Sequence, residues 1–268
     1  MSMQRKRRFA GIAGLALALV SSGGARPTAA QGGPPPEAYR QVAVWSALPQ
    51  ARAAGEFSTV AGLAAAGDRL YVADPQEHHI EVLGSDGSPR QRIGRAGVDL
   101  GRLRQPMDVS LDGDRLYVAD TGNRRVQVFD ALTGGFLAAW PGLDQPRAVL
   151  ATADGVWVAE ERLGRLLRFD RAGRLLESWG RGGSGSASGL DLRQPVGLAI
   201  GPDRDLYVAD LGRQAVLRVR QGRETQDYQL PDEGADGAPS DVAVDGDGTL
   251  YLPNRSGLYS IRRGLFGG

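Results

Sequence analysis

The sequence predicts an all-β protein, a β-propeller built from four-stranded antiparallel blades. The main observation is a five-residue segment, typically Leu-Tyr-Val-Ala-Asp, that recurs five times at intervals of 40 to 50 residues. A repeat of this length made of short β-rich segments is typical of a propeller blade. The five copies begin at Leu70, Leu116, Val156, Leu206 and Leu250.

The second repeat shows how each element is predicted. The segment at 116–120 has four consecutive apolar residues before its Asp, which indicates a strand covered on both faces. A strand that starts at a proline, 106–111, precedes it across the polar turn 112–114. Strands at 126–129 and 136–140 follow, so the unit has four antiparallel strands.

This second repeat resembles an NHL repeat. The Asn-His-Leu triplet that names the family falls on residues 123–125, here Asn-Arg-Arg, and in the first repeat on residues 77–79, where His78 occupies the His position. The resemblance covers about residues 57–263. It implies a propeller but selects no function, because NHL propellers serve binding, scaffolding, sensing and a few enzymatic roles.

The number of blades and the closure of the ring follow from the chain ends. The fifth repeat has no fourth strand after residues 258–261, and an isolated strand at 40–45 belongs to no repeat. We expect this strand to complete the last blade, because closure removes free sheet edges. The five repeats predict five blades, and residues 31–56 leave room for a sixth, partial blade.

The first thirty residues are typical of a secretory signal peptide. Basic residues 5–8 precede an uncharged segment, 9–20, and small residues lead to Ala30. That segment is too short to span a bilayer, which needs about 20 apolar residues. We therefore expect export to the periplasm or the exterior, a Gly/Pro-rich linker at 31–39 and a propeller domain at 40–268. The chain has no cysteine, so it forms no disulfide.

Charge restricts the class of partner. Removal of residues 1–30 takes away five of the 32 basic residues and none of the 31 acidic ones, which leaves a net charge of −4. A slightly acidic exported domain lacks the basic surface that nucleic acid requires. We expect a monomer without a membrane span, whose partner is a protein, a peptide or a glycan.

Five charged residues lie in loops and strand starts that the propeller order places near the mouth of the central channel. Asp108 and Asp241 align with each other, two residues after a proline, and two such carboxylates are a weak candidate site for calcium, which usually needs more oxygen ligands. We expect no cofactor and expect arginines to neutralise the two acids. The five candidate ligand-binding residues are Arg104, Asp108, Arg147, Arg193 and Asp241.

Other polar residues have a structural interpretation. The acids that end the recurring segment can accept hydrogen bonds from the turn that follows; they are Asp74, Asp120, Glu160 and Asp210. His78 and His79 are the only histidines, and a catalytic zinc site normally has three protein ligands. We therefore predict no catalytic residue.

Two classes of function remain. The first is an exported NHL-repeat propeller that acts as a binding or scaffold module for a protein, peptide or glycan through one face of the ring. The alternative is a metal-dependent propeller enzyme, similar to lactonase and lyase propellers, with a cation in the central channel. The scarcity of asparagine and histidine makes the chain poorly equipped for the second class, so binding is the preferred hypothesis.

Overall fold

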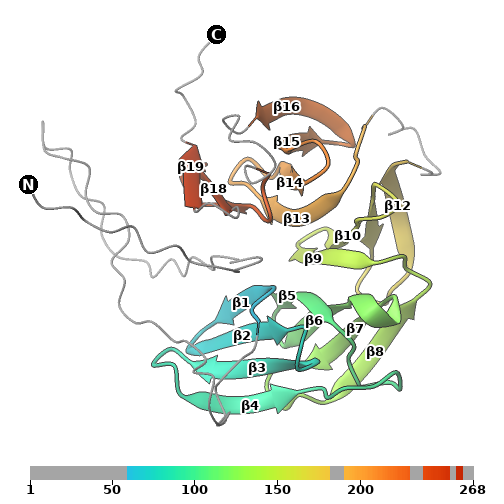
Figure 1. The fold of residues 1–268 in the computed structure, drawn as a ribbon, viewed down its shortest axis with the longest axis vertical. Helices are drawn as coiled ribbons and strands as arrows, with labels where there is room; N and C mark the ends of the chain where they lie inside the picture. Colours follow the sequence, from blue (N-terminus) through green and yellow to red (C-terminus); the bar gives the residue numbers. More distant parts are fainter. Residues whose placement is uncertain (1–58, 182–189, 230–237, 254–257, 262–268) are drawn as a thin grey trace, which may run out of the picture.

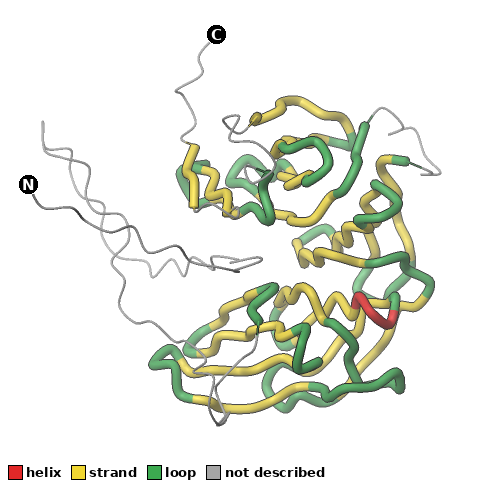
Figure 2. Tube along the Cα trace, viewed as in Figure 1, coloured by secondary structure: helices red, strands yellow, loops and turns green. Residues whose placement is uncertain are grey.

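A computed structural model describes residues 59–181, 190–229, 238–253 and 258–261. These residues form five antiparallel sheets, one for each repeat, and within each sheet the strands are paired in chain order. The prediction of an all-β fold with four-stranded blades is confirmed for four sheets, and the fifth has three described strands. Apart from strands, the described residues form only one short helical turn, η1 (Thr121–Asn123), drawn red in Figure 2.

The strands of the first three blades match the predicted segments to within a few residues. Blade 1 contains β1 (Leu63–Ala66), β2 (Arg69–Asp74), β3 (His79–Gly84) and β4 (Pro89–Ile93). Blade 2 contains β5 (Pro106–Asp112), β6 (Arg115–Asp120), β7 (Arg125–Asp130) and β8 (Phe136–Pro141). Blade 3 contains β9 (Pro146–Thr152), β10 (Gly155–Glu160), β11 (Arg165–Phe169) and β12 (Leu175–Gly180).

The last two blades continue the same order. Blade 4 contains β13 (Pro195–Ile200), β14 (Leu206–Asp210), β15 (Ala215–Arg220) and β16 (Arg223–Gln229). Blade 5 contains β17 (Ala243–Val244), β18 (Leu250–Pro253) and β19 (Leu258–Ile261).

The blades follow one another around an arc, with β1, β5, β9 and β13 toward the centre (Figure 1). The first strands of neighbouring blades contact each other along the series β1, β5, β9, β13 and β17. The strand predicted to close the ring at 40–45, the possible sixth blade at 31–56, the signal peptide and the linker all lie outside the described residues. Within the described part of the chain, no helix is long and apolar enough to span a membrane.

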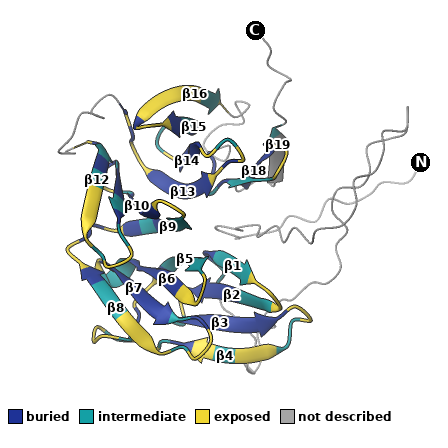
Figure 3. Ribbon diagram, turned by 180° about the vertical axis from the view of Figure 1, so that it is seen from behind, coloured by how far each residue is buried: buried dark blue, intermediate teal, exposed yellow. Residues whose placement is uncertain are grey.

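The recurring segment forms the second strand of every blade and lies at the centre of the packing. Its third position is fully buried in each copy: Val72, Val118, Val158, Val208 and Leu252. One apolar cluster lies between each pair of neighbouring blades, so the central strands of the inner blades are covered on both faces. Figure 3 shows the second and third strands mostly in dark blue and the outer strands β4, β8, β12 and β16 with much yellow. This two-sided burial explains why the segment lacks the alternation of a half-exposed strand.

Candidate functional site

One aligned position lies in or just before the first strand of each blade, on the side that faces the centre of the arc. Blades 1 to 5 contribute Gly62, Asp108, Ala148, Gly197 and Asp241. A Cβ added to Gly62 would lie 2.5 Å from Oδ1 of Asp108, and one added to Gly197 would lie 2.3 Å from Oδ1 of Asp241. The added Cβ would also lie 2.6 Å from Cα of Asp108 or 2.7 Å from Cα of Asp241, so the backbone and the carboxylate together require a glycine at this position in the preceding blade. The sequence alignment paired these positions, but it did not reveal this requirement.

Asp108 links blade 2 to blade 3. Its Oδ1 accepts a hydrogen bond from the N–H of Val109 (2.8 Å), and its Oδ2 accepts one from the N–H of Val149 in β9 (2.8 Å). Two residues further along β5, Oγ of Ser110 accepts a bond from the N–H of Ala151 (3.0 Å). The carboxylate is thus held in one orientation at the channel, half-buried.

Asp241 is also half-buried, and one of its carboxylate oxygens accepts a hydrogen bond from the backbone. Its Oδ1 accepts a hydrogen bond from the N–H of Val242 (2.8 Å). Burial raises the pKa of Asp241 to about 6. Burial, and then the charge of Asp241, raise the pKa of Asp108 to about 8. The two acids titrate as an interacting pair, and burial together with their mutual repulsion favours the protonated form of the pair.

Arg147 is the predicted arginine that joins this pair. It occupies a β-bulge in β9, where the pairing with β10 skips from Pro146 to Ala148, and bulges redirect side chains. Its charge lowers the pKa of Asp108 and of Asp241. Its Nε lies 3.8 Å from Oε2 of Glu161, a partner that the sequence reasoning missed.

Of the three predicted arginines, Arg147 is thus the one whose charge acts on both acids. Among the described residues, no ion pair joins an arginine to Asp108 or Asp241. Arg104 and Arg193 lie on loops that enter blades 2 and 4, with exposed side chains. Nε of Arg193 lies 3.8 Å from Asp191. The structure thus gathers three of the five candidate residues and leaves two on the rim, because a loop residue fixed through its backbone can direct its side chain to solvent.

The acids at the ends of the recurring segment fix these loops. Oδ1 of Asp120 accepts a hydrogen bond from the N–H of Arg104 (2.7 Å), and Oδ2 of Asp210 accepts one from the N–H of Arg193 (2.8 Å). Glu160 likewise accepts a bond from the N–H of Asp144 (2.5 Å). The predicted bonds to the following turn occur at Asp74 and Asp210. The sequence reasoning missed the bonds to the preceding loop.

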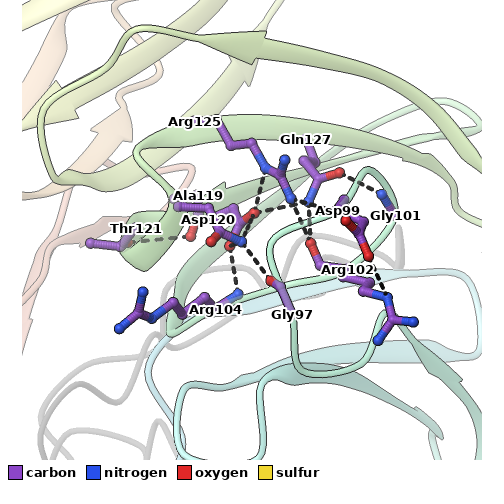
Figure 4. A network of polar contacts seen from close by, with 11 residues as sticks. Gly97, Asp99, Gly101, Arg102, Arg104, Ala119, Asp120, Thr121, Arg125 and Gln127 are labelled. Atoms are coloured by element: carbon purple, nitrogen blue, oxygen red, sulfur yellow. Dashed lines mark hydrogen bonds and ion pairs between the residues drawn. The ribbon is translucent and has the colours of Figure 1, made fainter.

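Figure 4 shows the most extensive of these contacts, around Asp120. Nε of Arg125 and Nε2 of Gln127 donate to Oδ2 of Asp120 (2.7 and 2.8 Å). Nη2 of Arg125 also donates to the carbonyl oxygens of Asp99 and Arg102 (both 2.8 Å). A fully buried carboxylate and a buried arginine thus hold the connection between blades 1 and 2.

The two histidines make structural contacts. His78 has a left-handed backbone (φ 61°), and its Nδ1 accepts a hydrogen bond from the N–H of Gln105 at the start of blade 2 (3.0 Å). His79 is 6% exposed, and its Nε2 lies 3.1 Å from Oε2 of Glu81. In the part of the chain that the structure describes, no three acidic or histidine residues gather as a metal site would require.

Comparison with known proteins fits this repeat architecture. The family model described as NHL repeat matches residues 103–129. The chain therefore contains an NHL repeat within a propeller fold. The match spans the first three strands of blade 2, including Asp120 and the side chains of Arg125 and Gln127 that contact it. No curated protein matches the chain.

Solved structures share the propeller fold at low sequence identity. A catalytically inactive variant of virginiamycin B lyase from Staphylococcus aureus, with quinupristin, is 14% identical, with a TM-score of 0.58 over 76% of this chain and 65% of that chain. The WD40 β-propeller domain of Doa1 is 13% identical (TM-score 0.59, 76% and 64% of the two chains). A chain of a nidogen/laminin complex is 18% identical (TM-score 0.59, 76% of each chain). The chain thus spans slightly less than two thirds of the lyase chain, and the likeness concerns the fold.

Proposed function

We propose that this chain is an exported binding propeller that captures a protein, peptide or glycan at the channel face of the ring. The observation that supports this proposal is the cluster of Asp108, Arg147 and Asp241. Three different blades place these half-buried groups at the centre, and neither aspartate has an ion-pair partner among the described residues. Ionisable groups held in this way are candidates for ligand recognition, because a ligand can supply the missing partner.

Two further observations support a binding role. Arg104 and Arg193 present exposed guanidinium groups on the loops of the same face, and arginine is common at protein interfaces. A chain of the nidogen/laminin complex shares the fold, so this architecture occurs in a protein that assembles with another. Export rests on the basic, apolar and small segments of residues 1–30.

The test is capture by the immobilised chain without residues 1–30. Proteins and glycans from periplasmic and extracellular fractions would be identified by mass spectrometry, with the wild type compared with Arg147→Gln and Asp108→Asn. The matched control is Arg174→Gln, an exposed arginine on the hairpin between β11 and β12. We expect the two channel variants to lose the captured partner and the control to retain it. Capture that is equal for all four proteins would contradict the proposal.

The alternative, a metal-dependent propeller enzyme, is favoured by one observation. The pKa of Asp108 near 8 would let its carboxyl group act as a proton donor at neutral pH, and virginiamycin B lyase shares the fold. The hydrogen-bonded histidines, and the presence of only two acids at the centre of the described blades, weigh against it. We expect no rise in melting temperature with millimolar calcium or micromolar zinc. A rise that disappears in Asp108→Asn/Asp241→Asn would favour the enzyme.

A further inference from the structure

A cleft of about 1210 Å³ lies between blades 3 and 4. It is lined by turn residues that follow the first strands of both blades, such as Asp154 and Arg204, and by Arg223, the first residue of β16. In an antiparallel blade these turns lie at the end opposite the loops that carry Arg104 and Arg193. The cleft is therefore separate from the channel cluster. We call this space wedge 3–4, and the equivalent space between blades 2 and 3 wedge 2–3.

Comparison with wedge 2–3 explains why this cleft is open. In wedge 2–3, Phe169 of blade 3 stacks on Trp140 of blade 2, with ring centroids 5.3 Å apart. Strand pairing makes Val219 the equivalent of Phe169, because Val219 pairs with Leu206 as Phe169 pairs with Val156. Valine is too small to fill the same space, so the opening follows from the sequence of blade 4.

The turn between the third and fourth strands adds to the difference. In blade 3 this turn spans residues 170–174 and covers Trp140, so closely that a Cβ added to Gly173 would lie 2.2 Å from the indole. In blade 4 the turn has only residues 221–222. The corresponding Trp179 therefore has no such cover and lines the cleft, half-buried.

The floor of wedge 3–4 is aromatic, and the edges of its opening are apolar. Trp157 and Trp179 lie with ring centroids 4.2 Å apart, and the guanidinium group of Arg168 lies 5.7 Å from the ring of Trp157. Leu176 is 42% exposed and Ile200 is 40% exposed at these edges. Such a surface accommodates bulky apolar side chains of a ligand.

The charges of the cleft favour an anionic ligand. Arg220 forms an ion pair with Asp205 (2.7 Å), and Arg168 forms one with Glu177. Arg204 and Arg223 are exposed and form no ion pair within the described residues, whereas Asp154 is the single lining carboxylate without one. The unpaired charge is therefore positive, and both free groups are guanidinium groups, which bind carboxylates in bidentate geometry.

The backbone of β12 forms one wall of the cleft. Four consecutive residues, 176–179, line it, so the edge of the strand and both of its side-chain faces border the space. In the described structure β12 pairs with β11 alone, and its outer edge is unpaired. An extended peptide can add to such an edge as a further strand, with its backbone N–H and C=O groups paired.

We propose that wedge 3–4 is a second binding site, which takes an extended acidic peptide with bulky apolar side chains as an added strand on β12. The peptide backbone pairs with β12, its apolar side chains contact Trp179, Leu176 and Ile200, and its carboxylates meet Arg204 and Arg223. This site is independent of the channel cluster and of the function proposed for it.

The test uses defined peptides and fluorescence anisotropy. The probe is a labelled six-residue peptide of alternating leucine and glutamate. The first comparison peptide has lysine in place of glutamate, and the second carries N-methyl groups on alternate backbone nitrogens, which cannot donate hydrogen bonds. We expect saturable binding of the glutamate peptide, and binding of each comparison peptide weaker by about tenfold or more. Equal binding of all three peptides, or no binding of the glutamate peptide, would overturn the proposal.

Variants locate the site. Arg204→Glu/Arg223→Glu reverses the free charges, and Val219→Phe fills the floor; each should weaken binding by about tenfold or more without loss of folding by circular dichroism. The matched control, Arg90→Glu/Arg174→Glu, reverses two exposed arginines that line neither the cleft nor the channel cluster, and it should bind normally. Hydrogen exchange of residues 175–180 should slow on binding. Normal binding by both cleft variants, or binding of a uronic-acid oligosaccharide but of no peptide, would overturn it.

Discussion

Blade 3 has a neighbour on each side, and the two wedges beside it differ in how they are filled. In wedge 2–3, Tyr117, Trp140 and Phe169 pack into one apolar cluster, and Trp140 is almost fully buried. In wedge 3–4, Trp157 and Trp179 take the places of Tyr117 and Trp140. The third residue is Val219, at the position that Phe169 has in wedge 2–3. The comparison shows that one repeat can form both a closed interface and a cleft, depending on one side chain and one turn length.

The largest expected effect on stability is a difference between two substitutions, one at Trp140 and one at Trp179. Trp140→Ala removes a buried ring from a filled wedge and should lower the free energy of unfolding by about 3–5 kcal/mol. Trp179→Ala removes a half-exposed ring, and we expect a loss of less than about 2 kcal/mol. Urea denaturation followed by circular dichroism measures both. Equal losses would mean that wedge 3–4 is packed as tightly as wedge 2–3.

A second variant converts the filled wedge toward the open one. Phe169→Val leaves a cavity beside Trp140 and should lower the free energy of unfolding by about 2 kcal/mol. Acrylamide should then quench tryptophan fluorescence more strongly, because water reaches the indole. The control is Phe136→Val on the exposed outer strand β8, which should change both quantities little. Unchanged quenching in Phe169→Val would show that the turn at 170–174 closes the wedge by itself.

The pH dependence of stability should come from the channel and not from either wedge. The pKa of Asp108 is raised to about 8 in the folded state, above its usual value near 4, so its contribution to stability is present at low pH and is lost as pH rises toward 8. We expect the free energy of unfolding to fall by at least about 1 kcal/mol between pH 5 and pH 8.

The double variant Asp108→Asn/Asp241→Asn should flatten this slope, whereas Trp179→Ala should keep it. Glu81 and Asp205 have lowered pKa values and act in the opposite direction, with stability lost as pH falls. Their effect lies below pH 5, outside the measured window. A slope that persists in the double aspartate variant would assign it to another group.

The smallest expected effect on stability comes from the variant that fills wedge 3–4. Val219→Phe places a ring in an existing cleft, and we expect the free energy of unfolding to change by less than about 1 kcal/mol. A thermal melt checks this value, and reduced quenching of Trp179 would show that the ring occupies the cleft. A loss of several kcal/mol would show that the space near Val219 is already filled.

The sequence predicts the blades well because each repeat encodes four strands through its own apolar segments and turns. It also predicts that Asp108 and Asp241 occupy one ring position, since the alignment of prolines sets their register. It does not predict the neighbours of Arg104 and Arg193, because the direction of a loop side chain depends on backbone bonds to distant residues such as Asp120. Wedge 3–4 was also missed, because the Phe169/Val219 difference acquires meaning only once strand pairing shows which residues face each other.

The glycines at Gly62 and Gly197 have a consequence for how such a ring can evolve. Duplication of single blades is a simple way to enlarge a repeat protein, but a copy of blade 3 inserted directly before blade 2 would bring Ala148 against Asp108. The methyl group would then occupy the space that Gly62 leaves empty, within 2.5 Å of the carboxylate oxygen. Blades of this chain are therefore not interchangeable units: a blade that carries the aspartate can follow only a blade that carries the glycine.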